Sequence, residues 1–255
     1  MKQLQKLLVV CLWAVLVPAH GQIIEIENYR VSEADTGWLG SVNLNFSAIS
    51  KVNTLYSFES NAQAAFSSKK HSFLAVNDLS FIFANNDEDF QREGYQHLRY
   101  GRRLDSTFTL EAFAQIQFDQ VLRIDRRILV GAGPRINFLK MADGRHGHLG
   151  VLYMYEHEVE DGTGIVHRDH RLSMYLSASA TIVDRVGLQF LTYYQPRFDR
   201  FDDFRLSSGA ALLFEISGHL TYHFTVHMTY DAAPVEDDNI SNLNSKVSNS
   251  FTYVF

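Results

Sequence analysis

The sequence has almost no cysteine and little proline. Cys11 is its one cysteine, and proline occurs four times in 255 residues. Because Cys11 falls in the leader described below, the exported chain can form no disulfide, and another restraint, such as a closed hydrogen-bonded sheet, must hold it together. Phe and Tyr are abundant, with 19 and 12 copies, and aromatic residues suit strands, whose pleated surface accommodates flat rings.

Basic residues are also scarce. Lys and Arg together number 23 against 29 Asp and Glu, a formal charge of −6. Removal of Lys2 and Lys6 with the leader makes the exported chain more acidic still. Surfaces that bind nucleic acid are basic, so this balance argues against a nucleic-acid partner.

No long hydrophobic run occurs after the first residues. The mean hydropathy is −0.13, and no later stretch approaches the roughly eighteen apolar residues that a spanning helix needs. A scan for spanning helices would therefore class the exported chain as soluble. Transmembrane β-strands evade such a scan, because apolar residues occupy only every second position.

Residues 1–21 have the pattern of a cleaved signal peptide. Lys2 and Lys6 provide the positive start, residues 7–17 form an apolar run of signal-peptide length, and small residues precede a cleavage point after Gly21. The sequence therefore predicts export from the cytoplasm.

The rest of the chain alternates between apolar and polar residues. We expect a periplasmic N-terminal extension at 22–36 and a barrel at 37–255. The alternation is clearest at 108–118 and 220–230, where period two gives each strand one apolar and one polar face. The pattern predicts an all-β, transmembrane antiparallel β-barrel of about twelve strands. The predicted strands are 37–48, 53–66, 71–84, 92–104, 107–118, 127–139, 147–158, 168–182, 186–197, 203–216, 219–231 and 243–255.

Connector lengths indicate which ends of the strands face outward. If both termini are periplasmic, the connectors after odd-numbered strands face outward. As a set they are longer than the connectors after even-numbered strands, as in outer-membrane barrels. We therefore expect the protein in the outer membrane of a diderm (Gram-negative) bacterium, surrounded by outer-membrane lipids.

The end of the chain and the aromatic residues favour the same location. Phe251, Tyr253 and Phe255 alternate up to a terminal aromatic residue, like the C-terminal strand that barrel-assembly machinery recognises. We expect that machinery as a partner. Other rings fall near both ends of the apolar face, where membrane barrels carry interfacial girdles. They are Trp38, Phe66, Phe73, Phe108, Phe138 and Phe214 at one end, and Phe83, Phe118, Tyr194, Phe204 and Tyr230 at the other.

The polar positions of the same strands predict the lining of a lumen. Charges of both signs in a narrow space should pair, because an isolated buried charge is expensive. We therefore expect a narrow or occluded channel for a small polar solute, or a membrane-structural protein, without catalysis. Bracing of the barrel alone remains the other interpretation of these charges. The predicted lumen-lining residues are Glu59, Asp78, Glu111, Arg127, Arg135, Glu156, Glu158, Arg171, Arg197, Arg205 and Glu215.

The sequence predicts neither a metal site nor a cofactor. His219, His223 and His227 share one face of one strand, where neighbours four apart are separated by about 13 Å. One ion cannot bridge that gap with bonds of about 2 Å. Gly131-x-Gly133 lies within a strand pattern, without the strand-turn-helix context of a dinucleotide or phosphate cradle.

Two other functions stay open. Some outer-membrane barrels are lipid-modifying hydrolases with a Ser–His pair on the lipid-facing wall, which requires a base within hydrogen-bond reach of the nucleophile. The third possibility is a soluble periplasmic binding barrel, which carbonate would release from a membrane pellet. The polar residues that interrupt the apolar face have no His two residues away, and their cross-strand neighbours depend on register: Ser60, Asn77, Thr192, Ser208 and Asn249.

Five short motifs resemble the YdiY-like outer-membrane proteins, a family of unknown function. The match covers most of the exported chain, and it implies an outer-membrane barrel without supplying an activity. Pro134 stands where an ordinary strand residue is expected; it cannot donate a ladder hydrogen bond, which a bulge would accommodate. The motifs are EAFAQIQ at 111–117, RRILVGAGPR at 126–135, YEHE at 155–158, HRLSMY at 170–175 and YYQP at 193–196.

Overall fold

In the residues that the computed structural model describes, all helical or strand structure is β-strand. None of these residues forms a helix that is long and apolar enough to cross a membrane. The predicted signal peptide at 1–21 and nearly all of the predicted extension at 22–36 lie outside the described residues. The described ranges are 36–50, 54–84, 90–140, 145–235 and 241–253.

Twelve strands follow one another along the chain, as the alternation predicts. They are β1 (Gly37–Ser50), β2 (Thr54–Ser67), β3 (His71–Ala84), β4 (Phe90–Arg103), β5 (Phe108–Asp119), β6 (Ile124–Lys140), β7 (His146–Glu160), β8 (Val166–Val183), β9 (Val186–Pro196), β10 (Phe204–Glu215), β11 (Leu220–Asp231) and β12 (Leu243–Tyr253).

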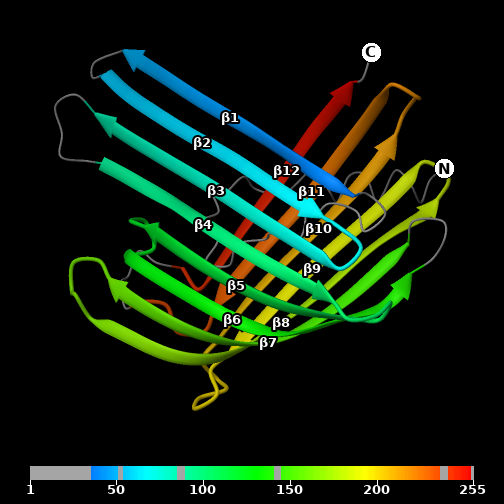
Figure 1. Ribbon diagram of the computed structural model, residues 1–255. Helices are drawn as coiled ribbons and strands as arrows, with labels where there is room; N and C mark the ends of the chain where they lie inside the picture. The colour runs from blue at the N-terminus through cyan, green and yellow to red at the C-terminus, as the bar shows by residue number, and fades with distance from the viewer. Residues whose placement is uncertain (1–35, 51–53, 85–89, 141–144, 236–240, 254–255) are drawn as a thin grey trace, which may run out of the picture.

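The strands form one antiparallel sheet in sequence order, so that each strand pairs with the next. Figure 1 shows that the sheet curls until β1–β5 pass in front of β9–β12 at a steep angle. β1 and β12 are its two edges, and no described residue of one pairs with the other. The predicted fold of twelve antiparallel strands is confirmed, and the seam between β1 and β12 is open in the described residues.

The predicted strand ranges differ from the observed strands by a few residues. The sixth strand begins at Ile124 rather than 127, because Ile124 pairs with Glu160 and Arg126 with Val159 on β7, with a register shift between them. No bulge forms at Pro134, which pairs with Leu110 on β5. The second irregularity of β6 lies instead between Asn137 and Leu139.

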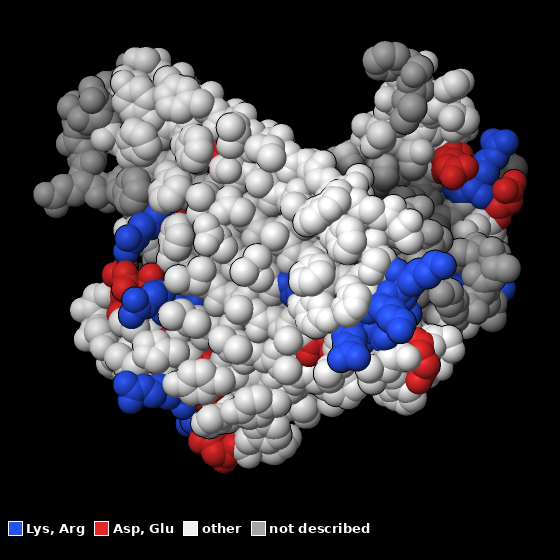
Figure 2. Space-filling view, viewed as in Figure 1, with Lys and Arg blue, Asp and Glu red and all other residues white. Residues whose placement is uncertain are grey.

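The curled sheet is apolar outside and polar inside. On β5, Leu110 and Ile116 are 49% and 42% exposed, whereas Glu111 and Gln117 are buried. In Figure 2 the middle of the front face is almost free of charge, and charged side chains gather near the ends of the strands. Soluble domains rarely bury acidic or basic side chains or expose large apolar patches. This sheet has the opposite distribution.

Candidate functional site on the inner face

The inner face of the sheet has two walls of different chemistry. The packed wall consists of the inward-facing residues of β4–β10, where charged and large side chains are buried. The polar wall consists of the inward-facing residues of β1–β3, β11 and β12, which are mostly Ser, Thr, Asn, Gln and His. Its exceptions are Asp231, which pairs with the packed wall, and a small buried apolar cluster of Ala65, Leu74 and Val76. In Figure 1, β5–β8 form the floor of the curl, and the polar wall flanks the seam.

Glu156 is the centre of an ion-pair network in the packed wall. It is fully buried, and its carboxylate contacts Arg127 on β6 at 3.1 Å and Arg171 on β8 at 2.7 Å. Arg205 on β10 contacts the same carboxylate and reaches Glu158 at 3.3 Å. Because β8 and β9 separate β7 from β10 in the sheet, Arg205 links strands that share no backbone hydrogen bonds.

Further carboxylates balance the remaining charge of these arginines. Arg205 also pairs with Asp231 on β11 at 3.0 Å. Asp169 pairs with Arg171 at 3.5 Å and with Arg197 at 3.3 Å. A buried ion costs several kcal/mol unless good geometry and added hydrogen bonds offset the lost hydration. The multiple contacts supply that compensation, so the network braces the curl.

The β9–β10 loop enters the same network through Asp203. Its carboxylate contacts Arg171 at 3.1 Å, Arg197 at 3.2 Å and Arg200 at 2.7 Å. Partial burial alone would raise the pKa of Asp203, but the hydrogen bonds and charges of these arginines lower it below its ordinary value of 3.8. The pKa of Asp199 is also lowered, by its hydrogen bond from Arg197. The ionised carboxylate of Asp203 therefore holds the β9–β10 loop to the ion-pair network.

Glu111 is the centre of a second buried group, nearer the opposite ends of the strands. It accepts hydrogen bonds from Arg99 on β4 at 3.0 Å and from the Tyr175 hydroxyl on β8 at 2.8 Å. Arg135 on β6 lies 3.6 Å from its other oxygen. The Arg99 guanidinium also lies over the rings of Phe113, at 5.3 Å, and Tyr175, at 5.6 Å. Tyr175 and Glu111 thus join two strands across the curl.

A buried apolar cluster fills the packed wall beside these charges. Two glycines make room for its rings: a Cβ on Gly150 would lie 2.0 Å from the Tyr175 ring, and one on Gly131 would lie 2.5 Å from the Phe113 ring. These side chains occlude the lumen next to the packed wall. The cluster consists of Phe113, Leu129, Leu152, Met154, Tyr175, Leu191 and Tyr193.

The polar wall has shorter side chains and fewer charges. Asn61 donates to Asp78 at 2.7 Å, and Asn45 donates to Glu59 at 3.3 Å. Neither acid has an ion pair with a described residue. Glu59 is exposed and Asp78 is half-buried. This wall therefore leaves hydroxyl and amide groups open to the lumen.

Histidines of the polar wall bond to neighbouring hydroxyls. His227 Nε2 lies 3.1 Å from Ser207 Oγ, and His223 Nε2 lies 3.3 Å from Thr252 Oγ1. Ser207 is fully buried, so its hydroxyl is closed to a substrate. Within the described residues, no three His, Cys, Asp or Glu are grouped to hold a metal ion.

The structure brings most of the predicted lumen-lining residues into the two buried groups. Arg197 joins them from the loop after β9. Glu59 and Asp78 lie apart, on the polar wall, and Glu215 is exposed at the end of β10. The members of the buried groups are Glu111, Arg127, Arg135, Glu156, Glu158, Arg171 and Arg205.

Sequence reasoning missed several members of these groups. Arg99, Asp169 and Asp231 occupy inward positions of their strands, so the alternation contains the signal for them. Tyr175 also lies on the inward face, but its contact with Glu111 depends on the curl. Asp203 belongs to a loop that turns back into the lumen, which no strand periodicity predicts.

Aromatic rings contact one another in rows on the outer face. The rows lie near both ends of the strands, where interfacial girdles are expected. They are Trp38–Phe66–Phe73–Tyr100 and Phe214–Tyr222–Phe251 at one end, and Phe58–Phe81–Phe118 and Tyr194–Phe204–Tyr230 at the other.

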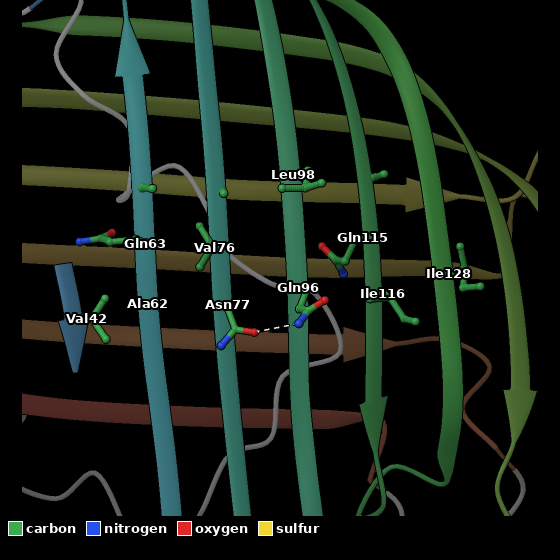
Figure 3. A pocket seen from close by; sticks show the side chains of 13 residues that line it. Val42, Ala62, Gln63, Val76, Asn77, Gln96, Leu98, Gln115, Ile116 and Ile128 are labelled. Atoms are coloured by element: carbon green, nitrogen blue, oxygen red, sulfur yellow. Dashed lines mark hydrogen bonds between the residues drawn. The ribbon is translucent and has the colours of Figure 1, made fainter. Parts of the chain in front are cut away.

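A shallow hollow lies on the outer face between the two girdles, over β1–β6 (Figure 3). Small side chains such as Ala64 and Ala75 line it. Gln96 donates a hydrogen bond to Asn77 at 3.0 Å, which the dashed line in Figure 3 marks. The hollow is an apolar surface, and its one polar pair is hydrogen-bonded within itself. Its lining residues include no nucleophile beside a base.

The register gives the cross-strand neighbours of Ser60 and Ser208, the two serines that interrupt the apolar face. Ser60 stands opposite Leu44 on β1 and Leu79 on β3. Ser208 hydrogen-bonds Thr192 at 2.8 Å. Among the described residues, neither serine has a histidine directly beside it. A lipid hydrolase would therefore need a nucleophile other than Ser60 or Ser208.

The chain matches a known family model over most of its length. One model matches residues 40–255, and its description is a protein of unknown function, DUF481. The chain belongs to the DUF481 family. The resemblance to YdiY-like proteins is confirmed, because these are known members of DUF481. The DUF481 family has no established activity, so membership assigns no residue a role.

No curated protein matches this DUF481 chain. Among solved structures, the porin NanC in a rhombohedral crystal form is similar, with a TM-score of 0.46 and 11% sequence identity. The match covers 86% of this chain and 99% of that one.

Proposed function

We propose that this chain is an outer-membrane β-barrel that carries small polar solutes through a narrow passage along its polar wall. The observation that supports this most is the inverted polarity of the sheet. Trp38, Val42 and Phe46 are 76%, 70% and 67% exposed on the outer face, while Glu111 and Glu156 are fully buried inside. Hydrocarbon is the solvent that matches such an outer face.

Closure of the seam is part of this proposal. Unpaired backbone groups at a sheet edge are costly in lipid, because no water is there to satisfy them. The outer faces of both edge strands are already apolar, with Phe251 and Tyr253 on β12 66% and 62% exposed. Pairing of β1 with β12 would satisfy both edges and join these apolar faces into a continuous belt.

The two walls have different roles in the proposed barrel. The packed wall is filled by its ion pairs and by the apolar cluster, so it braces the barrel and blocks its own side of the lumen. The polar wall presents short hydroxyl and amide side chains that can exchange hydrogen bonds with a passing solute. Small polar solutes therefore fit this passage better than large or apolar ones.

Export and assembly complete the proposal. The signal-peptide pattern at 1–21 supports passage into the periplasm. The alternating end of β12, with Phe251 and Tyr253 facing outward, supports recognition by barrel-assembly machinery; Phe255 lies outside the described residues.

Carbonate extraction tests the location. We expect the protein to remain in the membrane pellet and to migrate faster on gels when it is not boiled. Release into the carbonate supernatant would identify a soluble periplasmic barrel and would contradict the proposal.

Single-channel recording in a planar bilayer tests the passage. Thr225 belongs to the polar wall and faces the lumen, and its neighbour Val226 faces outward. We expect Thr225→Trp to reduce conductance severalfold and Val226→Trp to leave it unchanged. A folded wild-type protein without openings, or equal conductance in both variants, would contradict a passage at this wall.

A further inference from the structure

Three arginines interrupt the apolar outer face at one end of the sheet. Arg92, Arg126 and Arg168 are each the third residue of their strand, in β4, β6 and β8. All three lie at the end where the odd-numbered strands finish. This end also carries the two longest connectors, 197–203 and 232–242, and it is the outward-facing end in the orientation proposed above.

The register shows that the second and third of these side chains project outward. Arg126 stands opposite Val159, and the next residue, Arg127, is buried on the inner face. Arg168 is exposed, and the next residue, Asp169, is buried on the inner face. Neighbouring residues of a strand point to opposite faces, so both arginines belong to the lipid-facing surface.

Two of the three arginines, Arg126 and Arg168, have no ion-pair partner among the described residues. Arg92 pairs with Asp125 at 3.1 Å, but neither Arg126 nor Arg168 has an ion pair or side-chain hydrogen bond with a described residue. His157 on β7 stands opposite Arg168. Its Nδ1 is buried and has no hydrogen-bond partner among the described residues. The two guanidinium groups therefore lie on either side of the His157 strand, and no described acidic residue pairs with either of them.

The depth of the arginines in the proposed bilayer points to a lipid headgroup as their partner. An arginine on the lipid face of a barrel costs about 2–4 kcal/mol at the bilayer midplane and about 0–1 kcal/mol near the interface. The third residue of a strand lies near the interface, where lipid phosphates are found. Guanidinium groups match phosphate because they donate two parallel hydrogen bonds to it.

The spacing indicates which headgroup fits. Arg126 and Arg168 lie on the two sides of β7, so about 10 Å separates their strands. A single phosphate can meet both guanidinium groups only if the two side chains converge on it. A glycolipid with phosphates at both ends of its sugar unit can contact both.

Aromatic side chains lie directly beside the arginines on the outer face. The Tyr153 hydroxyl bonds His170 Nδ1, and the Tyr155 and His170 rings are 5.4 Å apart. Phe198 stacks on Tyr153 at 6.2 Å and is 46% exposed. Such a surface can contact a sugar ring and the first carbons of its acyl chains.

We propose that Arg126 and Arg168, on the strands to either side of His157, bind the phosphates of an anionic glycolipid of the outer leaflet. This inference rests on the proposed outer-membrane function, because it places this end of the barrel in the outer leaflet. It adds a lipid partner that occupies the outer wall rather than the lumen.

The test measures lipid binding to the refolded mature chain by native mass spectrometry from detergent micelles. The probes are diphosphoryl lipid A, its dephosphorylated form and phosphatidylglycerol. We expect the wild type to prefer diphosphoryl lipid A over both others. The double variant Arg126→Gln/Arg168→Gln should lose roughly tenfold or more of that affinity, since charge-assisted hydrogen bonds are lost.

A matched control removes two basic residues from the opposite end, in the double variant Lys69→Gln/Arg102→Gln. Its affinity for diphosphoryl lipid A should equal that of the wild type. Equal losses in both double variants, or equal binding of phosphatidylglycerol by the wild type, would overturn the inference in favour of a general charge effect.

Flotation with phosphatidylcholine vesicles separates this inference from the proposed function. If the wild type and both variants float with vesicles but show no preference for diphosphoryl lipid A, only the lipid site is wrong. If the folded wild type fails to float, the outer-membrane proposal is wrong and the lipid site with it.

Discussion

The packed wall and the polar wall differ although one alternating pattern builds both. In the packed wall, Glu111 and Glu156 are fully buried and each contacts several cationic or hydroxyl donors. In the polar wall, Glu59 and Asp78 are bonded by single asparagine amides and remain open. Inward-facing charge alone therefore does not mark a passage. Charge that is buried and multiply paired marks the braced side of the lumen, and the proposed passage lies on the opposite side.

Removal of one central carboxylate should have the largest effect. Glu156→Gln leaves Arg127, Arg171 and Arg205 without their shared partner, and a broken buried ion pair costs about 3–5 kcal/mol. The matched change in the polar wall, Glu59→Gln, should alter the free energy of unfolding by less than about 0.5 kcal/mol. Urea unfolding of both variants in vesicles measures the difference. Equal destabilisation would remove the distinction between the walls.

Loss of the hydrogen bond between Tyr175 and Glu111 should have the next largest effect on the free energy of unfolding. Tyr175→Phe removes a hydrogen bond to a buried charged group, which contributes about 1.5–3 kcal/mol. Thr225→Val, which removes a 3.4 Å bond to the Ser248 carbonyl in the polar wall, should cost less. The same urea titration compares them, and a larger loss in Thr225→Val would contradict the contrast.

A methyl group at Gly150 tests how tightly the packed wall is filled. Gly150→Ala would place a Cβ 2.0 Å from the Tyr175 ring, and overpacking of this kind costs about 1–3 kcal/mol. Gly187→Ala is the control, because its Cβ would meet Leu213 at an ordinary 3.6 Å. Thermal unfolding should separate the two variants. An unchanged midpoint in Gly150→Ala would show that the ring moves aside freely.

Acidification should release the β9–β10 loop from its ion pairs, and it should lower the stability by less than the substitutions above. The pKa of Asp203 in the folded protein lies below its ordinary value of 3.8. Its stabilising contribution is therefore complete well above pH 3.8 and is lost as the pH falls through the lower, folded value. Asp203→Asn should flatten this part of the dependence of the unfolding midpoint on pH. An identical acid slope in wild type and variant would contradict the assignment.

The sequence predicted the strands better than it predicted their contacts. Period-two alternation identified all twelve strands and the inward side of Glu111 and Arg205, because strand geometry is local. It did not predict that Tyr175 meets Glu111 or that Asp203 turns into the lumen. Those contacts depend on the curl of the whole sheet. Their sequence separations of 64 residues for Tyr175–Glu111 and 32 for Arg171–Asp203 exceed the reach of any local pattern.

The bond from Arg205 to Glu156 has a consequence for how the barrel assembles. These residues are 49 positions apart, and contacts that close long loops form late because closure has an entropic cost. The packed wall cannot be complete until β7 to β10 have been synthesised and curled together. The chain's two ends, β1–β3 and β11–β12, lie outside this middle segment. The proposed pairing of β1 with β12 closes a far longer loop, so the packed wall can form before the two ends meet.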